Sequence, residues 1–155
     1  MRKYKRLTRF RDRPRYRKTS TFLTEVERDM LKALQDMVGS GLKVYPNVRL
    51  YDLLELAGGR EETNTDLAVR LRCEVVDFVV CDARTSAPTL VVELRNTSDE
   101  TADTIERNDF VEWILSTASL PLLLISRESP QSIVQLAQVV QSSLSEYIRK
   151  SSAAA

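Results

Sequence analysis

The chain has 155 residues, of which 43% are hydrophobic and 29% are charged, and this is the composition of one globular domain. It contains no histidine, which excludes Ser-His-Asp and Cys-His hydrolases, HExxH metalloproteases and zinc sites that need histidine ligands. The net charge of +1 is unevenly distributed. Residues 1–18 contain ten Lys and Arg against Asp12 alone, and the remaining residues contain 13 Lys and Arg against 21 Asp and Glu. A segment of charge +9 therefore precedes a body of charge −8.

The two cysteines, Cys73 and Cys81, are too few for a disulfide framework or a four-ligand zinc site. If they share one strand, their spacing points both to the same face, and we expect both to be buried reduced thiols. The apolar runs are far shorter than the ~18 residues of a membrane span. No hydrophobic stretch follows the basic N-terminus as it does in a secretory signal. We therefore expect a cytoplasmic protein that does not span a membrane.

Residues 1–19 form the first predicted segment, a basic run with aromatic side chains at Tyr4, Phe10 and Tyr16. Like charges in such a run repel each other, so we expect the segment to be disordered on its own. Basic side chains bind a phosphate backbone by displacing counterions, and aromatic rings stack on bases. Nucleic acid, with DNA favoured, is the predicted partner; acidic lipid and a merely solubilising tail are the alternatives left open. The residues predicted to bind nucleic acid are Arg6, Arg9, Arg11, Arg13, Arg15, Arg17 and Lys18.

The first predicted helix begins after Thr24, because Thr24 and Glu27 have the spacing of a capping box, and it ends at Gly39. Residues 43–56 alternate well enough for a strand before they drift towards a short helix. Pro46 predicts that this strand lies at an edge of the sheet or carries a bulge.

Two strands are predicted at the centre of the chain, over residues 74–82 and 89–95. The first is β-branched and apolar on both faces, as expected for a strand that is covered on both sides. A Ser-Pro pair at residues 129–130 has the form of an N-cap followed by proline, so it predicts the start of a last helix. The other predicted elements are a polar loop at 58–66, a helix at 101–117 with Ile105, Phe110, Ile114 and Leu115 inward, a strand at 120–126 and a disordered tail at 151–155.

This order of helix, three strands, helix and strand predicts an α/β domain over residues 20–150. We expect a small mixed sheet flanked by helices. The αβββαβ order is also the core order of the restriction-endonuclease-like fold, although fold order alone establishes no chemistry.

Two acidic residues, Asp77 and Glu93, interrupt the two central strands. A charge in a covered strand costs several kcal/mol unless it is paired or bound to a cation. If the hairpin turns symmetrically about Thr85, the two residues are cross-strand partners with Cβ atoms about 5 Å apart on one face of the sheet. Mg²⁺ or Mn²⁺ suits such an all-oxygen site, and Arg95 would project from the same face as Glu93. This spacing is typical of metal-dependent phosphodiesterases, in which the metal polarises the phosphate and the basic residue holds the water or the developing charge.

Several alternatives remain open at this point. Asp77 or Glu93 would instead form a structural ion pair with Arg95, or a one-residue slip in the hairpin would put the two acids on opposite faces. Glu27 is either a capping-box residue only or a further catalytic carboxylate. Arg107 either is exposed on its helix or reaches the site from it.

Six stretches of the sequence occur in a familiar order: LTEVERDMLKAL at 23–34, KVYPNVRLYDLL at 43–54, VVDFVVCD at 75–82, LVVELRNTSD at 90–99, ERNDFVE at 106–112 and LPLLLI at 120–125. Together they resemble a bacterial family of uncharacterised domains. That family is regarded as part of the PD-(D/E)XK nuclease-like group, near the very-short-patch-repair endonucleases. The resemblance implies motif acids at Asp77 and Glu93 and a first-helix acid at Glu27.

The chain departs from this family within the motif itself. Relatives often carry histidine at the positions occupied here by Val75 and Asp99, and their acidic pair is replaced here by Arg95-Asn96. Arg95 restores something like Glu-x-Lys, but a guanidinium cannot lose a proton and replaces lysine imperfectly. The site is therefore either rewired or inactive.

The first functional hypothesis is a metal-dependent nuclease-like domain that hydrolyses DNA phosphodiester bonds. Its catalytic residues would be Asp77, Glu93, Arg95 and Glu27, with Asp77 and Glu93 as ligands of Mg²⁺ or Mn²⁺ and the basic tail on the phosphate backbone. The alternative is a catalytically degenerate nuclease-fold protein that serves as a nucleic-acid-binding or assembly subunit. Because small nucleases of this fold often need a second subunit to hold duplex DNA, we expect a homodimer or a partner subunit.

Overall fold

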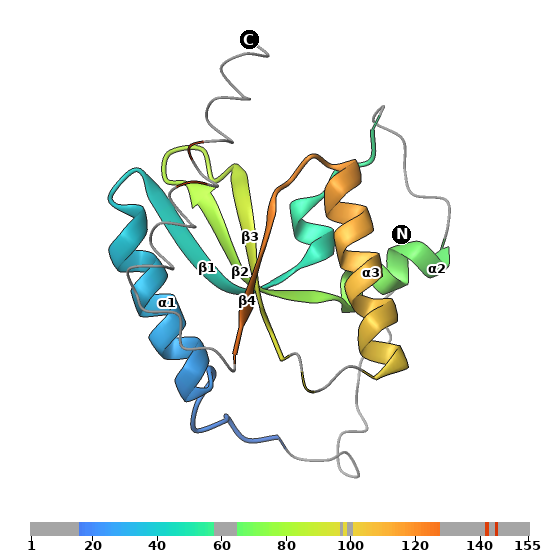
Figure 1. Cartoon of the computed structure of the whole chain (residues 1–155), viewed down its shortest axis with the longest axis horizontal. Helices are drawn as coiled ribbons and strands as arrows, with labels where there is room; N and C mark the ends of the chain where they lie inside the picture. The colour runs from blue at the N-terminus through green and yellow to red at the C-terminus, as the bar shows by residue number, and fades with distance from the viewer. Residues whose placement is uncertain are drawn as a thin grey trace, which may run out of the picture.

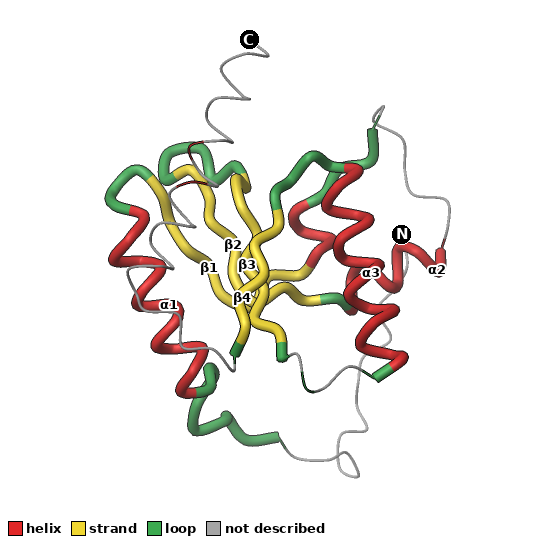
Figure 2. The backbone as a smooth tube through the Cα atoms, in the orientation of Figure 1, coloured by secondary structure: helices red, strands yellow, loops and turns green. Residues whose placement is uncertain are grey.

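The computed structural model describes residues 16–57, 65–96, 98, 101–127, 142 and 145. The predicted disorder before Tyr16, most of the predicted polar loop and the predicted tail at 151–155 lie outside the described residues. So does the helix expected after Pro130, apart from Ser142 and Ser145, which are helical. Figures 1 and 2 show the described part as a sheet with helices on both of its faces.

The described part of the chain contains one four-stranded mixed sheet, made of β1 (Leu42–Arg49), β2 (Val75–Asp82), β3 (Pro88–Arg95) and β4 (Leu122–Ser126). The strands lie in the order β1-β2-β3-β4. β2 pairs antiparallel with β1 and with β3, whereas β4 pairs parallel with β3. A parallel neighbour needs a crossover connection, and α3 (Ala102–Thr117) supplies it. The predicted α/β class and αβββαβ order are confirmed.

Helices cover both faces of this sheet. α1 (Glu25–Val38) lies on one face, and α2 (Thr65–Cys73), the 3-10 helix η1 (Leu50–Leu53) and α3 lie on the other (Figures 1 and 2). None of the helices among the described residues is long and apolar enough to cross a membrane.

Capping side chains fix the start of α1. The Thr24 hydroxyl accepts a hydrogen bond of 3.3 Å from the Glu27 backbone N–H, and the Glu27 carboxylate accepts one of 2.7 Å from the Thr24 N–H. The predicted capping box is therefore confirmed. α1 ends at Gly39, whose φ of 66° lies in the left-handed region that glycine adopts without strain.

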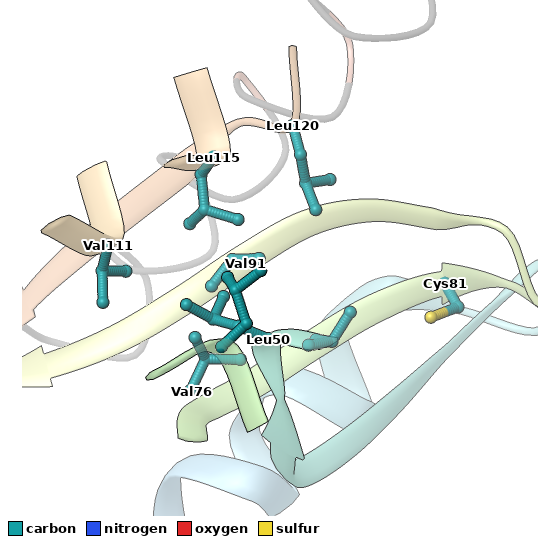
Figure 3. Packing of buried hydrophobic residues seen from close by; sticks show 9 residues of the cluster. Leu50, Val76, Cys81, Val91, Val111, Leu115 and Leu120 are labelled. Carbon is teal, nitrogen blue, oxygen red and sulfur yellow. The ribbon is translucent and has the colours of Figure 1, made fainter. Parts of the chain in front are cut away.

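Apolar side chains fill the two faces of the sheet in separate clusters, so β2 is covered on both sides as its sequence predicts. The cluster under α1 contains Leu34, Val44, Phe78, Val80, Leu90, Val92, Leu94 and Ile125. The cluster on the opposite face, seen in Figure 3, contains Leu50, Leu71, Val76, Val79, Cys81, Val91, Val111, Leu115 and Leu120.

β1 is an edge strand of the described sheet, as Pro46 predicts. Asn47 has a φ of 53°, and the pairing with β2 skips it, because Pro46 pairs with Phe78 and Val48 with Val76. The predicted change from strand to short helix is confirmed, since η1 follows β1 directly.

α2 departs from the expected polar loop, because Thr65 and Asp66 already belong to the helix. Five of its nine residues are apolar, but nine residues that follow a polar run are too few to establish a helical repeat in the sequence. Arg70 fixes it to α3 through an ion pair of 3.0 Å with Glu106 and a guanidinium 4.0 Å from the centre of the Phe110 ring.

The prediction that both cysteines are buried on one strand is wrong for Cys73. This residue ends α2 and is exposed, whereas Cys81 lies in β2 and is buried. The helix continues to Cys73, so the strand begins only at Val75.

α3 turns most of the expected residues inward, since Phe110 and Ile114 pack against the cluster on this face of the sheet. Leu115 is buried as predicted, but Ile105 is 45% exposed and its predicted inward position is wrong. The inward stripe runs through Arg107, Val111 and Leu115 at a spacing of one helical turn. Because Arg107 is charged, the pattern of apolar residues does not show that its side of the helix faces inward.

Candidate functional site at the end of the sheet

The β2–β3 hairpin has the register expected from a turn centred on Thr85. Phe78 pairs with Val92, and the residues next along each strand are Asp77 and Glu93. A bulge between Val80 and Cys81 makes the turn itself asymmetric. The two acids therefore lie at the far end of the hairpin, close to the first residues of β2 and the last residues of β3.

Asp77 marks the point at which β2 and β3 separate. Its Oδ2 accepts a hydrogen bond of 2.7 Å from the Leu94 backbone N–H, so a side chain replaces the strand-to-strand hydrogen bond at this position. The ladder between the two strands extends only to Phe78 and Val92, although β2 starts at Val75. The Asp77 carboxylate is thus held in the gap between the strands.

Arg127, one residue beyond β4, supplies positive charge to Asp77. Its Nη2 lies 3.8 Å from Oδ1 of Asp77 and 3.9 Å from Oε1 of Glu27. Its Nε donates at 3.3 Å to the Leu94 carbonyl, and its backbone N–H donates at 2.9 Å to the Arg95 carbonyl. Glu27 is therefore a helix cap that also lies near Asp77 through the shared Arg127, and its catalytic role stays a prediction.

Glu93 is only 3% exposed, and Arg107 of α3 reaches it. The Arg107 Nη1 lies 3.4 Å from Oε2 of Glu93, and Nη2 lies 3.4 Å from Oε1. The same guanidinium donates at 3.1 Å to Glu74 and at 2.8 Å to the Val75 carbonyl. The open question about Arg107 is answered, since its side chain lies at the site rather than free on the helix surface.

Arg95 does not form the ion pair that sequence reasoning offered as an alternative. Its Nη1 lies 2.6 Å from Oε1 of Glu112 on α3, so the suggested pairs with Asp77 and Glu93 are wrong. α3 lies on the face of the sheet from which Arg95 projects, and it places Glu112 nearer to Arg95 than Asp77 or Glu93. Within the part of the chain that the structure describes, the buried Nε and Nη2 of Arg95 have no hydrogen-bond partner.

Burial is the main influence on the pKa values of Asp77 and Glu93. Desolvation raises the pKa of Asp77, against the hydrogen bond from Leu94 and the charge of Arg127, and it raises the pKa of Glu93 against the charge of Arg107. The negative charge of Asp77 raises the pKa of Glu93 further. The pKa of Glu27 is lowered, chiefly by the hydrogen bond from the Thr24 N–H. Positive charge near Asp77 and Glu93 would therefore stabilise their ionised forms.

Carboxylate oxygens are ligands that divalent cations prefer, and Asp77 and Glu93 are both desolvated carboxylates. Among the described residues, no group of three or more acidic or cysteine side chains is arranged to hold a metal ion. Arg107 and Arg127 are the positive groups that face Glu93 and Asp77. A metal at this position would have to share the carboxylates with these two arginines.

Two of the predicted nucleic-acid-binding residues, Arg17 and Lys18, lie in the described part of the chain and are exposed. The others, Arg6, Arg9, Arg11, Arg13 and Arg15, lie outside the described residues.

Three residues of the site were not predicted from the sequence, namely Glu74, Glu112 and Arg127. A signal for Arg127 exists in the sequence, because it is the first charged residue after an apolar strand. Parallel pairing of Arg95 with Ser126 brings that strand end to the same edge of the sheet as the motif. Recognising this would have required the strand order in advance.

A family model described as "Protein of unknown function (DUF2726)" matches residues 19–144. The chain belongs to this family. Comparison with curated proteins and with solved structures gave no significant match. The matched range of the DUF2726 family includes every strand and helix described above and all the residues of the site.

Replacing Asp77 tests whether the carboxylate is present for stability. With the folded-state pKa raised, Asp77 stabilises the fold below about pH 4 and loses this contribution as the pH rises through its folded-state pKa. We expect Asp77→Asn, which keeps an acceptor for the Leu94 N–H, to be as stable as wild type near pH 4 and at least as stable at pH 7. Asp77→Ala leaves that N–H without its acceptor and should lose about 1–3 kcal/mol. Urea denaturation at both pH values measures these differences.

Asp36→Asn is the matched control, because Asp36 is exposed on α1 and its replacement should change stability by less than about 0.5 kcal/mol. A loss of stability in Asp77→Asn that grows from pH 4 to pH 7 would contradict the prediction and indicate a structural ion pair with Arg127.

Proposed function

We propose that this DUF2726-family domain hydrolyses phosphodiester bonds of nucleic acid, with DNA as the favoured substrate, where β2 and β3 separate. Asp77 and Glu93 would hold Mg²⁺ or Mn²⁺, and Arg95 would bind the phosphate. The observation that carries the proposal is that Nε and Nη2 of Arg95 are buried without a hydrogen-bond partner within the described chain, close to the desolvated Glu93. These two N–H groups form the edge of a guanidinium that binds phosphate through two hydrogen bonds.

The resemblance of the sequence to the PD-(D/E)XK nuclease-like group, near the very-short-patch-repair endonucleases, supports the same proposal. It assigns the motif acids to Asp77 and Glu93, each of which adjoins one residue of the last pair in the β2–β3 ladder, Phe78 and Val92. Glu27 would act as the first-helix acid, since it shares Arg127 with Asp77.

Each residue of the candidate site has a defined role in this proposal. The Leu94 N–H orients the Asp77 carboxylate, Arg107 neutralises Glu93, and Arg95 binds an oxygen of the scissile phosphate. When bound, a divalent ion supplies positive charge that polarises the phosphate and lowers the pKa of a water molecule. Since Arg95 cannot lose a proton, its contribution is binding and charge stabilisation rather than proton transfer.

The test uses the full chain on supercoiled plasmid and on single-stranded DNA, with Mg²⁺ or Mn²⁺ and with EDTA in parallel. Metal-dependent cleavage is expected, and Glu93→Gln should lower its rate by at least about a hundredfold. The exposed Asp36→Asn serves as the matched acid-to-amide control. Cleavage that survives both Glu93→Gln and Asp77→Asn would overturn the assignment of the site.

A second candidate function is a catalytically degenerate domain that binds nucleic acid or a partner subunit. The specific observation in its favour is that both strand acids already have an arginine, with Arg107 on both oxygens of Glu93 and Arg127 near Asp77. Binding of labelled DNA without cleavage under any metal condition would favour this candidate over the nuclease.

A further inference from the structure

The outward face of α3 combines exposed apolar and acidic side chains. Ile105 and Trp113 are 45% and 53% exposed, while the opposite side of the helix packs against the sheet. Asp109 lies one helical turn from each of them and is exposed as well. These three residues, with Glu106 and Glu112, define the outward face. Exposed apolar side chains that gather on one side of a helix are typical of an interaction surface.

The charged groups of this outward face are acidic. α3 has one basic residue, Arg107, which points inward to Glu93, so its positive charge lies on the other side of the helix. Glu106 and Glu112 are paired with arginines of other elements, but their side chains stay 73% and 49% exposed. The acidic residues of α3 are Asp103, Glu106, Asp109 and Glu112. The outward face therefore attracts basic groups and repels a phosphate backbone.

Trp113 gives the outward face a group that binds positive charge. A cation is attracted to the face of an indole ring more strongly than to other aromatic rings. The same interaction occurs close by, where the Arg70 guanidinium lies 4.0 Å from the centre of the Phe110 ring. The centres of the Phe110 and Trp113 rings are 6.2 Å apart, so an aromatic pair continues from the half-buried Phe110 to the exposed Trp113. A lysine or arginine of another segment would meet this ring and the Asp109 carboxylate together, because the two residues are neighbours on the helix surface.

Residues 1–18 of the same chain have the complementary chemistry. They contain ten Lys and Arg against one Asp, with Tyr4 and Phe10 among them. Tyr16 is 92% exposed, and Figure 1 shows the chain before α1 at the end of the sheet where α3 begins. Fifteen residues precede Tyr16 and could span up to about 50 Å, whereas the 16 residues of α3 are about 24 Å long. The segment is therefore long enough to cover the outward face of α3.

We propose that residues 1–18 dock on the outward face of α3 in the same molecule when no nucleic acid is bound. Their basic side chains lie against Asp109 and Trp113, and nucleic acid must displace them in order to bind the segment. The contact is autoinhibitory, because the segment predicted to bind a phosphate backbone is then occupied by its own domain. This inference goes beyond the proposed function and does not depend on phosphodiester hydrolysis.

Trp113 is the only tryptophan of the chain, so its fluorescence reports on this face alone. We expect acrylamide, an uncharged quencher, to quench Trp113 at least about twice as effectively at 500 mM as at 20 mM sodium chloride, because salt screens the charges that hold the segment. The Stern–Volmer constant of the full chain measures this change without nucleic acid. A constant that does not rise with salt would overturn the inference.

Two variants of the full chain show whether the salt effect comes from docking. Replacing the seven predicted nucleic-acid-binding residues by glutamine should leave Trp113 open to acrylamide at both salt concentrations. Asp109→Lys repels the segment and should do the same, whereas Asp36→Lys, an equal charge reversal at an exposed position of α1, should behave as wild type does. In the glutamine variant, Asp109→Lys should have little further effect. A full salt response in either the glutamine variant or Asp109→Lys would overturn the inference.

If Asp109→Lys does not fold, as judged by circular dichroism, Asp109→Asn takes its place and should lose part of the salt response. Protein concentration then identifies the molecule that supplies the segment. Docking within one molecule gives the same protection of Trp113 at concentrations that differ about fiftyfold. Protection that grows with concentration would mean that the segment of a second copy covers α3, and it would overturn the inference.

DNA binding tests the autoinhibitory consequence. Asp109→Lys should bind a labelled duplex at least about threefold more tightly than Asp36→Lys, because both gain the same charge but only the first releases the segment. Equal affinities would overturn the autoinhibitory role. The proposed function fails or stands separately, since a chain that cleaves DNA but shows no salt-dependent protection of Trp113 loses only the docking.

Discussion

A chain without residues 1–18 is expected to bind DNA at least about a hundredfold less tightly than the full chain at 100 mM salt. The deletion removes a charge of +9 and leaves a body of −8, which repels a phosphate backbone. Each lost phosphate contact should also reduce the slope of log affinity against log salt concentration by about 0.9. Fluorescence anisotropy with a labelled duplex at several salt concentrations measures both quantities.

A matched variant separates charge from length in this experiment. Replacing the seven predicted nucleic-acid-binding residues by glutamine keeps the chain length and should reproduce most of the loss. Replacing Tyr4, Phe10 and Tyr16 by leucine keeps the charge and should affect single-stranded DNA more than duplex DNA, because exposed bases stack on aromatic rings. Unchanged affinity after the deletion would show that the tail is not the DNA-binding element.

Phe78→Ala is expected to lower the free energy of unfolding by about 3–5 kcal/mol. Phe78 is fully buried, belongs to the cluster under α1, and lies next to Asp77 in the last pair of the β2–β3 ladder. Truncation leaves a cavity at the position that aligns the two strands before they separate. Urea denaturation followed by circular dichroism measures the loss.

Phe22→Ala provides the comparison for this substitution, because Phe22 is 71% exposed and its truncation should cost less than about 0.5 kcal/mol. A loss below 1 kcal/mol for Phe78→Ala would mean that the cluster under α1 rearranges to fill the cavity, contrary to the prediction.

Local patterns in the sequence were enough to predict most of the fold. The Thr24–Glu27 spacing, the apolar run of β2 and the placement of Pro46 each depend on neighbouring residues and on one element. The register of the hairpin followed from Thr85 because a short turn fixes which residues of adjoining strands meet. α2 was missed because it is short and its position depends on tertiary contacts, namely the burial of Leu71 against the sheet and the contacts of Arg70 with α3.

The location of Asp77 and Glu93 was predicted, but their partners were not. Sequence periodicity tells which residues face inward and carries no information about which opposite charges meet. Arg107 was one of several charged residues on its helix, and its pairing with Glu93 depends on how α3 crosses the sheet. Arg95 joined Glu112 for the same reason. The identity of the substrate and the role of the tail stay predictions.

The parallel pairing of β4 with β3 also sets the time at which the site can be completed during folding. Arg127 is 50 positions from Asp77 and 100 from Glu27, so its contacts are among the most distant in sequence at the site. Contacts at such separation form late, because the intervening chain must first lose its freedom. A nascent chain that ends before β4 would thus carry Asp77 and Glu27 without the cation that links them. Assembly of the candidate site is therefore coupled to the last strand among the described residues, and a partly synthesised domain lacks the complete site.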